Sequence, residues 1–367
     1  MNKLRVLQLI PFASDPVIHG GKIRVSKVHS FLQNSDFLVE QFFAGDQHVA
    51  KQNTPEWIVD LPDSLASDVK LVFSEFVLPP NYAFQFDIVI FEHPWQFEQA
   101  KILRTQNPEL KLIYSSHNIE WKLKQQILKP YLGEKVERVA SFIRNLEYEI
   151  SSFVDGIICV SSSDVEWFAE FSDVPTIVVN NASDLRKSPD NKQQTLLKNY
   201  GLIVGSAHPP NIEGCFKFIN DADLWLPREY HLKIVGTLAT ALQDPFKGAK
   251  NIDFLNRLSN EELSSVIGSA SCLILPIAYG AGTNLKTAEA LVSGRPIVGS
   301  RIAFRGYEMF MDSDNVTVTD DPFTFKRAVL NYLHQWRPDT IRKFSENLNW
   351  DYALKDLPKF LMNIYLS

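Results

Sequence analysis

The sequence is poor in the features that mark secreted and membrane proteins. It has three cysteines in 367 residues, Cys159, Cys215 and Cys272, which lie far apart in apolar runs. This spacing offers neither a zinc-ligand pair nor a disulfide framework, so we expect three small buried side chains. No stretch approaches the roughly 18 consecutive apolar residues of a membrane span. The N-terminal MNKLRVLQLIPF has too short an apolar run for a signal peptide and lacks a small-residue cleavage site. We therefore expect a cytoplasmic protein.

An excess of basic residues is also missing. Lys and Arg number 37 against 43 Asp and Glu, for a net charge of −6, which argues against a nucleic-acid-binding protein. Hydrophobic residues make up 45% and charged residues 22%, a composition typical of soluble globular proteins. A chain of this length suggests about two domains of roughly 100–200 residues each.

Short apolar runs of strand length alternate with longer helical patterns. In 134–153, apolar residues recur at 136, 139, 140, 143, 146 and 150, which predicts one apolar helix face. Short apolar strands separated by helices predict a parallel sheet covered on both faces. The strands expected in the first half are 4–10, 87–91, 110–115, 156–160 and 176–180.

A polar stretch, 183–199, separates this pattern from a second one and is interpreted as a linker. The second half repeats the alternation, with expected strands at 202–205, 231–236, near 252–254, 271–276, 295–300 and 315–319. We predict an α/β protein with two doubly wound, parallel-sheet, Rossmann-like domains, at 1–182 and 200–338. The tail, 339–367, is helical in pattern, and its return to the first domain is left open.

The segment Gly280–Leu291, GAGTNLKTAEAL, predicts a helix that begins on glycines. Four amides at a helix start lack intrahelical partners and favour an anion, above all a phosphate. Glycines at 280 and 282 let a ligand approach the backbone, and Lys286 adds a positive charge. Glu289 lies on the same side of the helix as Lys286 and can accept hydrogen bonds from a ribose diol. Together they indicate a nucleotide-sugar; the alternative is a tight helix start with Lys286 and Glu289 paired in solvent. The dinucleotide fingerprint does not fit, because its third glycine falls on Leu285.

Five segments in order resemble family 4 retaining glycosyltransferases of the GT-B fold, the glycosyl transferases group 1. They cover nearly the whole chain and are PFASDPVIHGGKIRV (11–25), SSHNIEW (115–121), DGIICVSSSD (155–164), LIVGSAHPPNIEG (202–214) and LILPIAYGAGTNLKTAEALVSGRPIVGS (273–300). The resemblance implies two domains facing across a cleft, with a nucleotide-sugar held mainly by the second domain and an acceptor held mainly by the first. It also implies transfer with retention of configuration, without a cofactor and without an obligatory metal.

The predicted site residues combine the phosphate-binding pattern with this resemblance. His117 follows an expected strand and would position the acceptor, Lys286 would stabilise the diphosphate, and Glu289 would hold the ribose; these are the predicted catalytic residues. The amides of 282–285 join Lys286 at the phosphates. The predicted donor-binding residues are Gly20, Gly21, Arg24, Gly205, Ser206, Arg257, Leu258, Gly282, Thr283, Asn284 and Leu285.

Two positions depart from the family pattern. The first of the family's two donor-site glutamates falls on Ala281, so the identity of the transferred sugar cannot be inferred from this position. The turn Ser206–Asn211 lacks the family's phosphate-binding Arg and Lys, so Lys286 and the helix amides would carry the diphosphate, with help from Ser206 or Arg24.

Other features leave alternatives open. The residues Glu92–Trp95 either line the acceptor pocket or form a turn closed by Pro94. The basic and apolar segment 122–138 is either a solvated face or a peripheral contact with the inner face of the plasma membrane. The acceptor would be a glycan, a glycolipid or a lipid-linked intermediate. The rival functions are a nucleotide-sugar epimerase and a catalytically degenerate transferase that only binds its ligands.

Overall fold

The computed structural model describes residues 3–12, 20–44, 49–52, 54–79, 81–183, 199–256, 258–335 and 346–367. They form two compact units. Unit 1 comprises Met1–Asn180 and Leu354–Ser367, and unit 2 comprises Asn181–Ala353. Most of the predicted linker, 184–198, lies outside the described residues.

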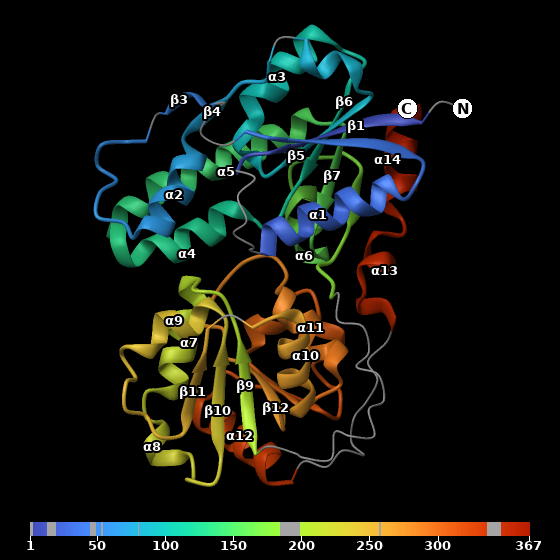
Figure 1. The fold of residues 1–367 in the computed structure, drawn as a ribbon. Helices are drawn as coiled ribbons and strands as arrows, with labels where there is room; N and C mark the ends of the chain where they lie inside the picture. Colours follow the sequence, from blue (N-terminus) through green and yellow to red (C-terminus); the bar gives the residue numbers. More distant parts are fainter. Residues whose placement is uncertain are drawn as a thin grey trace. The chain divides into compact units, whose positions relative to one another are not determined.

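Unit 1 is built on a six-stranded parallel sheet in the order β2-β1-β5-β6-β7-β8 (Figure 1). Four of these strands are nearly free of exposed side chains, which explains why their apolar runs stand out in the sequence. The strands are β1 Leu4–Ile10, β2 Phe37–Phe43, β5 Ile88–Glu92, β6 Lys111–Ser115, β7 Gly156–Cys159 and β8 Thr176–Val178. A separate antiparallel pair joins β3 Val49–Gln52 to β4 Ser74–Phe76.

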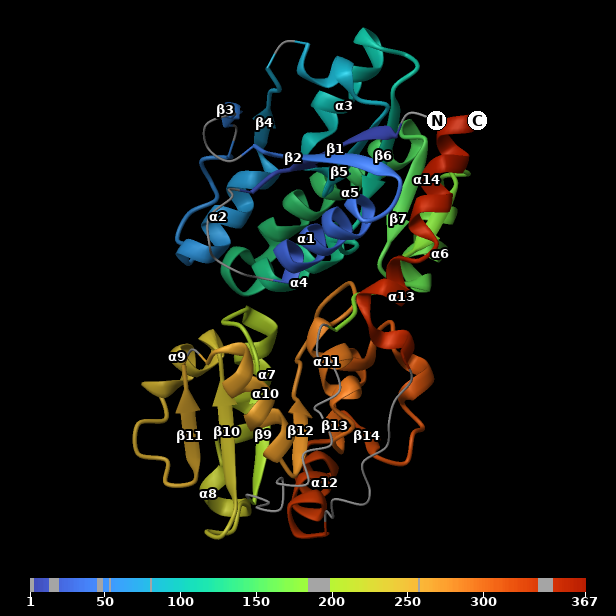
Figure 2. The same ribbon diagram turned by 45° about the vertical axis from the view of Figure 1, so that its right-hand side comes forward.

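The helices of unit 1 are α1 Gly20–Gln33, α2 Asp63–Val72, α3 Phe97–Gln106, α4 Glu120–Leu132, α5 Val136–Phe153, α6 Ser162–Ala169 and α14 Leu357–Leu366. Helix α5 begins two residues later than the predicted 134–153 helix and buries Val139, Ile143 and Ile150 on the expected face. Helix α14 lies beside β7 (Figure 2): a side chain at Gly156 would overlap Ile364 and lie 3.1 Å from Phe360. The end of the chain therefore packs into unit 1.

Unit 2 has a second six-stranded parallel sheet, ordered β11-β10-β9-β12-β13-β14, which Figure 2 shows side by side. Its strands are β9 Tyr200–Val204, β10 His231–Val235, β11 Ile252–Leu255, β12 Cys272–Leu275, β13 Ile297–Gly299 and β14 Val316–Val318. Its helices are α7 Pro209–Ile219, α8 Ala222–Trp225, α9 Thr237–Gln243, α10 Asn260–Ser269, α11 Leu285–Ser293 and α12 Pro322–Gln335, while α13 Trp350–Leu354 reaches the boundary between the units.

Successive residues of the unit 2 strands enter two different cores. Ile203 and Ile274 pack in one cluster with residues of α7, α9 and α12, whereas Leu202 and Leu273 pack in another with residues of α10 and α11. This is the arrangement of a parallel sheet covered on both faces, as the sequence predicts. All three cysteines are free and buried, which confirms that expectation too.

Each sheet has a point where the chain changes direction of winding, and the two strands on either side of it are not consecutive in sequence. In unit 1 the change lies between β1 and β5, and in unit 2 between β9 and β12. Ligands of open α/β sheets bind outside the carboxyl ends of the strands at such points. The loops after these four strands therefore mark where a ligand is expected in each unit.

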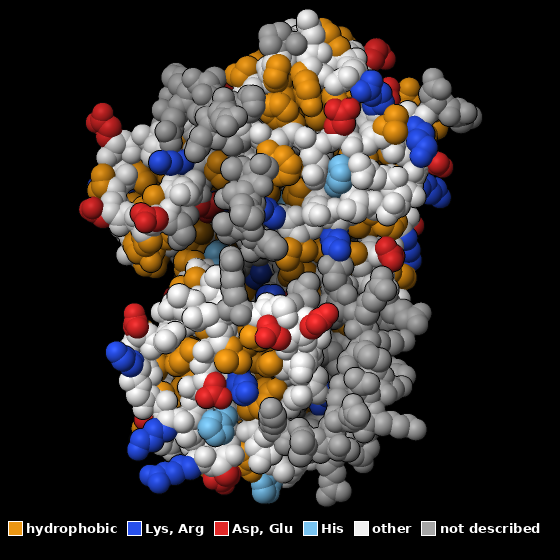
Figure 3. All heavy atoms as spheres, viewed as in Figure 1, with side chains coloured by type: hydrophobic (Ala, Val, Ile, Leu, Met, Phe, Trp, Pro, Cys, Tyr) orange, Lys and Arg blue, Asp and Glu red, His pale blue; other side chains and the backbone are white. Residues whose placement is uncertain are grey.

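The described part of the chain contains no helix that is both long and apolar enough to cross a membrane. On the face shown in Figure 3, acidic and basic side chains are interspersed over both units. No broad single-sign area of the kind that nucleic-acid binders present is visible on that face.

Candidate functional site

The loop that follows β12 connects the winding change of unit 2 to helix α11. It spans residues 276–284 and includes two glycines with positive φ, Gly280 at 151° and Gly282 at 67°. A side chain at Gly282 would be strained there, so glycine allows the loop to take this path. We refer to residues 276–284 as the donor loop, after the ligand predicted for it.

Helix α11 begins with a side-chain cap. Asn284 Oδ1 accepts a hydrogen bond from the Lys286 amide at 3.1 Å, and the Thr287 amide donates to the Asn284 carbonyl at 3.0 Å. The Asn284 side chain is thus the cap of helix α11, while the prediction for Asn284 concerned its own backbone amide and stays a prediction. The amide of Leu285, the first helical residue, has no intrahelical acceptor by its position.

Lys286 and Glu289 form an ion pair, with 2.9 Å between Nζ and Oε2. Their side chains are 27% and 19% exposed, so the pair is half-buried rather than fully solvated. The contact between the two residues agrees with the alternative considered from the sequence, while their place on the first turns of α11 agrees with a ligand site. A bound diphosphate would compete with Glu289 for the lysine.

Arg305, which was not predicted as a site residue, forms hydrogen bonds with the donor loop. The guanidinium of Arg305 donates to the carbonyls of Gly280 at 2.5 Å, of Ala281 at 2.7 Å and of Gly282. Arg305 comes directly after the 3₁₀ helix η5 Arg301–Phe304. No sequence pattern indicated it, because the contacts arise only when the segment after β13 folds beside the loop after β12.

Thr283 is fixed by residues far from it in sequence. Asn181 donates from its backbone to Thr283 Oγ1 at 3.3 Å and from Nδ2 to the Thr283 carbonyl at 3.1 Å. The hydroxyl of buried Tyr307 donates to the Asn181 carbonyl at 2.6 Å. Hydrogen bonds to its hydroxyl and to its carbonyl therefore fix Thr283 at the end of the donor loop.

The predicted residues after β9 have mainly structural contacts. Gly205 packs against α9, where a side chain would lie 2.8 Å from Leu238. Asn211 Nδ2 donates to the Ser206 carbonyl at 3.1 Å and closes the turn. Leu258 packs against the core beside α10, and Arg257 lies outside the described residues.

Gly214, from the same sequence segment, has a packing role that bears on the donor loop. A side chain on it would overlap the carbonyl oxygen of Pro276, and the Ala278 amide donates to the Pro210 carbonyl at 3.2 Å. Helix α7 can approach the start of the donor loop only because position 214 has no side chain.

In unit 1, Gly20 and Gly21 are the first two residues of α1 rather than part of the preceding loop. Residues 13–19 lie outside the described residues. Arg24 points into the protein: it is 1% exposed, and its guanidinium donates to the Val179 carbonyl at 2.7 Å. The predicted contact of Arg24 with a donor phosphate or an acceptor group stays a prediction, and its buried guanidinium already holds the Val179 carbonyl.

His117 lies at the carboxyl edge of the unit 1 sheet and is paired with a carboxylate. Its Nε2 is 2.6 Å from Oε2 of Glu92, the last residue of β5, and Gln8 donates to the other Glu92 oxygen at 2.6 Å. Burial works to raise the pKa of Glu92, but hydrogen bonds from His117 and Gln8 outweigh it and hold the pKa below its usual value. Burial, with His93 nearby, lowers the pKa of His117 to about 4.

These pKa shifts, together with the contact to Glu92, indicate which ring nitrogen of His117 carries the hydrogen. An ionised Glu92 can only accept, so His117 is neutral with its hydrogen on Nε2, and Nδ1 carries the lone pair. Such a nitrogen can accept a hydrogen bond from a hydroxyl group. The sequence indicated His117, but assigned Glu92 only to a pocket wall or a turn.

His93 is held beside His117 in a strained backbone conformation. Its φ is 69° and its ψ is 163°, a region that non-glycine residues rarely adopt. The two imidazole centroids are 4.1 Å apart, and His93 Nδ1 is 3.0 Å from Glu120 Oε1. Strain of this kind collects at functional sites, which favours the pocket interpretation of Glu92–Trp95 over a simple turn.

The strain at His93 can be measured with two substitutions. We expect His93→Gly to be more stable than His93→Ala by about 1–2 kcal/mol, because both lose the ring but only glycine accepts this φ and ψ freely. Urea unfolding of both variants, monitored by circular dichroism, gives the difference. An alanine variant as stable as the glycine variant would show that His93 is unstrained.

A buried network supports this edge of unit 1. Glu147 of α5 accepts from the amides of Glu120 at 2.8 Å and Trp121 at 3.0 Å, and so caps α4 from a neighbouring helix. Burial and the nearby Glu120 raise the pKa of Glu147 well above its usual value. Burial works to raise the pKa of Glu120 as well, but His93 and Lys124 outweigh it and lower that pKa to about 2.

Lys124 corrects the interpretation of segment 122–138 as a basic surface. Its side chain is 5% exposed and forms ion pairs with Asp68 and, at 3.8 Å, with Glu120. One of the five basic residues of this segment thus belongs to the interior of unit 1.

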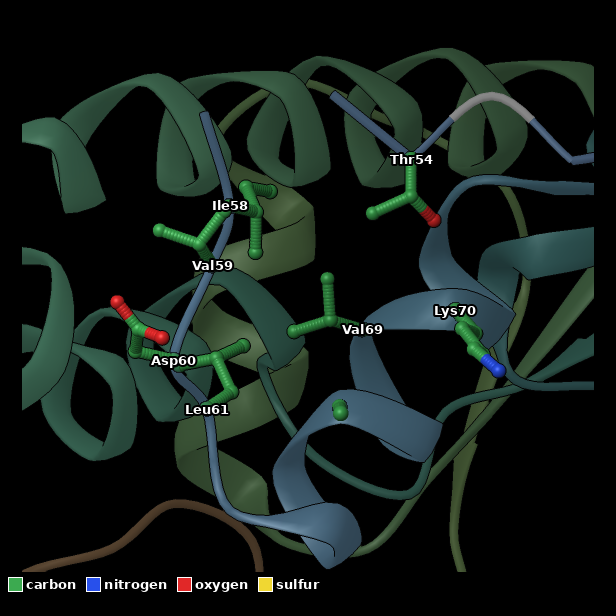
Figure 4. A pocket seen from close by; sticks show the side chains of 8 residues that line it. Thr54, Ile58, Val59, Asp60, Leu61, Val69 and Lys70 are labelled. Carbon is green, nitrogen blue, oxygen red and sulfur yellow. The ribbon is translucent and has the colours of Figure 1, made fainter. Parts of the chain in front are cut away.

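The cavity shown in Figure 4 lies elsewhere in unit 1 and has a volume of about 400 Å³. Val69 of α2 faces Ile58 and Val59 across it, whereas Lys70 points away from them. The residues that line it are Thr54, Ile58, Val59, Asp60, Leu61, Ala66, Val69 and Lys70. None of them is a predicted site residue. The chemistry of the loops at the sheet edges is therefore a better guide to function than the size of this cavity.

Residues 198–335 match the family model described as Glycosyl transferases group 1. The matched segment lies within unit 2. The match spans the donor loop, α11 and Arg305. No curated protein sequence matches the chain.

Solved structures share the fold of the whole chain at low sequence identity. Sucrose-phosphate synthase from Thermosynechococcus elongatus has a TM-score of 0.72 at 14% identity, over 99% of each chain. Anabaena HepE in complex with UDP-glucose has a TM-score of 0.63 at 14% identity, over 98% of this chain and 100% of that one. The catalytic domain of starch synthase IV from Arabidopsis thaliana, bound to ADP and acarbose, has a TM-score of 0.61 at 12% identity, over 100% and 99%. The chain thus has the GT-B fold, with two parallel-sheet α/β units of six strands each.

Proposed function

We propose that this protein transfers a sugar from a nucleoside-diphosphate-sugar to an acceptor hydroxyl, with retention of configuration and without a metal. The observation that carries the proposal is the position of the donor loop. It lies at the winding change of the unit 2 sheet, leads into the start of α11, and falls inside the segment that matches the glycosyltransferase family.

In this proposal unit 2 binds the donor. The amides of the donor loop and of Leu285 hold the diphosphate, and Lys286 leaves Glu289 to contact it. Glu289 then accepts hydrogen bonds from the ribose hydroxyls. Arg257 and Leu258 border the base, and Gly205 and Ser206 line the neighbouring turn. The structurally similar Anabaena HepE has been solved in complex with UDP-glucose, which makes uracil the first base to test.

Unit 1 then binds the acceptor, through His117. The lone pair on Nδ1 accepts a hydrogen bond from the acceptor hydroxyl, and the Glu92 carboxylate keeps the ring in that tautomer. Acceptors of the proposed class are glycans, glycolipids and lipid-linked intermediates. Gly20 and Gly21 at the start of α1 are proposed to lie near the donor, and Arg24 is proposed to support this end of α1 through its hydrogen bond to the Val179 carbonyl.

Departure of the nucleoside diphosphate places negative charge on its terminal phosphate while the sugar becomes cation-like. Fixed amide dipoles and Lys286 stabilise that charge without rearranging in the transition state. We propose that the acceptor attacks from the face that the leaving group vacates, which retains the configuration without a covalent sugar–enzyme intermediate.

The protein is proposed to act in the cytoplasm. Peripheral contact with an anionic membrane would use the basic residues of 122–138 other than the buried Lys124. Lys122, Lys129, Lys135 and Arg138 are the remaining candidates.

A panel of nucleoside-diphosphate-sugars tests the proposed function. The protein is incubated with each sugar, with and without a cell extract that supplies acceptors, and nucleoside diphosphate release is measured. Release that increases with the extract, together with labelled product, supports transfer. Binding of a donor without any turnover would contradict transfer and favour a binding protein, and release of an epimerised nucleotide-sugar would favour an epimerase.

Lys286 and Glu289 should have separable effects on UDP binding. We expect Lys286→Gln and Glu289→Gln each to weaken binding by about 1–3 kcal/mol, the scale of a lost charged hydrogen bond. Calorimetry with UDP and uridine distinguishes them, because only Glu289→Gln should also weaken binding of uridine, which has a ribose but no phosphate. Lys217→Gln, in an exposed lysine–glutamate pair on α7, is the control. Unchanged UDP affinity in the Lys286 variant would contradict its phosphate role.

A further inference from the structure

The guanidinium of Arg305 binds the carbonyl side of three successive residues in the donor loop. Its acceptors are Gly280, Ala281 and Gly282, each reached by a different nitrogen of the same planar group. A planar fork with several fixed donors is a property of arginine that lysine does not share. The contact therefore specifies the path of the loop as well as placing a charge beside it.

Peptide geometry fixes what happens on the opposite side of the loop. In a trans peptide the carbonyl of one residue and the amide of the next point in opposite directions, and the peptides here are trans. When the three carbonyls turn toward Arg305, the amides of Ala281, Gly282 and Thr283 turn away from it. Within the described residues none of these three amides donates to a protein acceptor. Successive amides on one side of a loop form a concave anion site.

The segment that carries Arg305 is attached to helix α11 on one side of Arg305 and to Asn181 on the other. Thr287 Oγ1 of α11 donates to the Ala303 carbonyl at 2.5 Å, and Tyr307 is anchored at Asn181 at 2.6 Å. Arg305 lies between these two attachment points along the chain. Its position relative to the donor loop is thus fixed by neighbours on both sides.

We propose that Arg305 is a positioning residue that shapes the donor loop into a diphosphate-binding site. It acts by holding three carbonyls away from the ligand and so presenting three amides to it, next to the amide of Leu285. This rests on the proposed function, and it names the part of the site that replaces the phosphate-binding Arg and Lys missing from the turn Ser206–Asn211.

The test compares two substitutions that differ in charge. Arg305→Lys keeps the positive charge but loses the fork, whereas Arg305→Gln loses both. We expect both variants to bind UDP about tenfold more weakly or worse, the scale of one lost charge-assisted hydrogen bond, and to bind uridine as the wild type does. Calorimetry measures UDP, and competition nuclear magnetic resonance measures uridine. Arg301→Gln, an exposed arginine four positions earlier, is the matched control and should bind both ligands normally.

The outcomes separate this inference from the proposed function. If the wild type binds UDP and Arg305→Lys retains that affinity, only the charge of Arg305 matters and the positioning role is wrong. If both variants lose uridine together with UDP, Arg305 supports the fold of unit 2 and the inference is also wrong. If the wild type binds none of UDP, ADP, GDP and TDP, the proposed function fails first and this inference fails with it.

Discussion

Replacing Gly214 with alanine is expected to destabilise unit 2 by about 3 kcal/mol or more, the upper range for an overpacked interior. Inside a helix such as α7 the same change would otherwise stabilise by about 1 kcal/mol. Here the new Cβ overlaps the Pro276 carbonyl oxygen and lies 2.7 Å from its carbonyl carbon and 2.9 Å from the Ala278 amide. These are backbone atoms, so no side chain can rotate away and the donor loop itself must move.

Three measurements detect the displacement of the donor loop. Thermal unfolding should occur at a lower temperature, and hydrogen exchange should increase in peptides that cover β12 and α11 while peptides of unit 1 stay protected. UDP affinity should fall as well, because the loop that binds the diphosphate starts at Pro276.

Gly20→Ala is the matched control for Gly214→Ala. It also adds one methyl group to a helical glycine, but no atom of the described residues lies within 4 Å of the new carbon. Its stability should equal or exceed that of the wild type. If Gly214→Ala proved as harmless as this control, α7 would not pack on the donor loop as described.

The sequence predicted most of the fold because the strands are buried on both faces. Continuous apolar runs such as β5 and β12 need no knowledge of their neighbours to be recognised. Strand β2 was missed: it is an edge strand whose first four residues alternate between buried and exposed side chains, and whose last three are partly exposed. A strand paired on one side only leaves a weaker pattern in the sequence.

The candidate site was predictable only where local sequence determines it. The glycines and the helix start of the donor loop are consecutive residues, so their chemistry can be recognised directly. Arg305 and Glu92 were not assigned their roles, because their partners lie 23–25 positions away and meet them through the sheet order. Lys124 was misassigned to the surface because its ion-pair partner Asp68 lies 56 positions earlier.

Glu92→Gln is expected to reduce sugar transfer by about a hundredfold or more, on the scale seen when a catalytic histidine is forced into the wrong tautomer. The wild-type carboxylate accepts from both Gln8 and His117 at 2.6 Å. A glutamine can accept from Gln8 with its oxygen, but its amide nitrogen then faces His117 Nε2. His117 must accept there, which moves its proton to Nδ1 and removes the lone pair proposed to meet the acceptor hydroxyl.

Three measurements define this effect. Transfer of labelled sugar into extract acceptors should fall, UDP affinity should remain unchanged, and histidine ¹⁵N resonances should show the switch from the Nε2–H to the Nδ1–H tautomer. Glu98→Gln is the control, since Glu98 is an exposed carboxylate in the same unit with a side chain that is 61% exposed. Full transfer by Glu92→Gln after a confirmed tautomer switch would exclude His117 Nδ1 from the reaction.

The pH dependence of stability provides a second test of the same pair, independent of any acceptor. Burial beside His93 lowers the pKa of His117 to about 4, against 6.5 in the unfolded chain. Between these values the unfolded state binds the proton more readily, so stability is fully present above pH 6.5 and decreases as the pH falls toward 4. A shift of this size corresponds to at most about 3 kcal/mol. We expect His117→Gln to lose part of this acid sensitivity, leaving the carboxylates to act at lower pH. Urea unfolding between pH 7 and 4 measures it, and equal pH dependence in wild type and variant would mean that His117 is not held neutral by its surroundings.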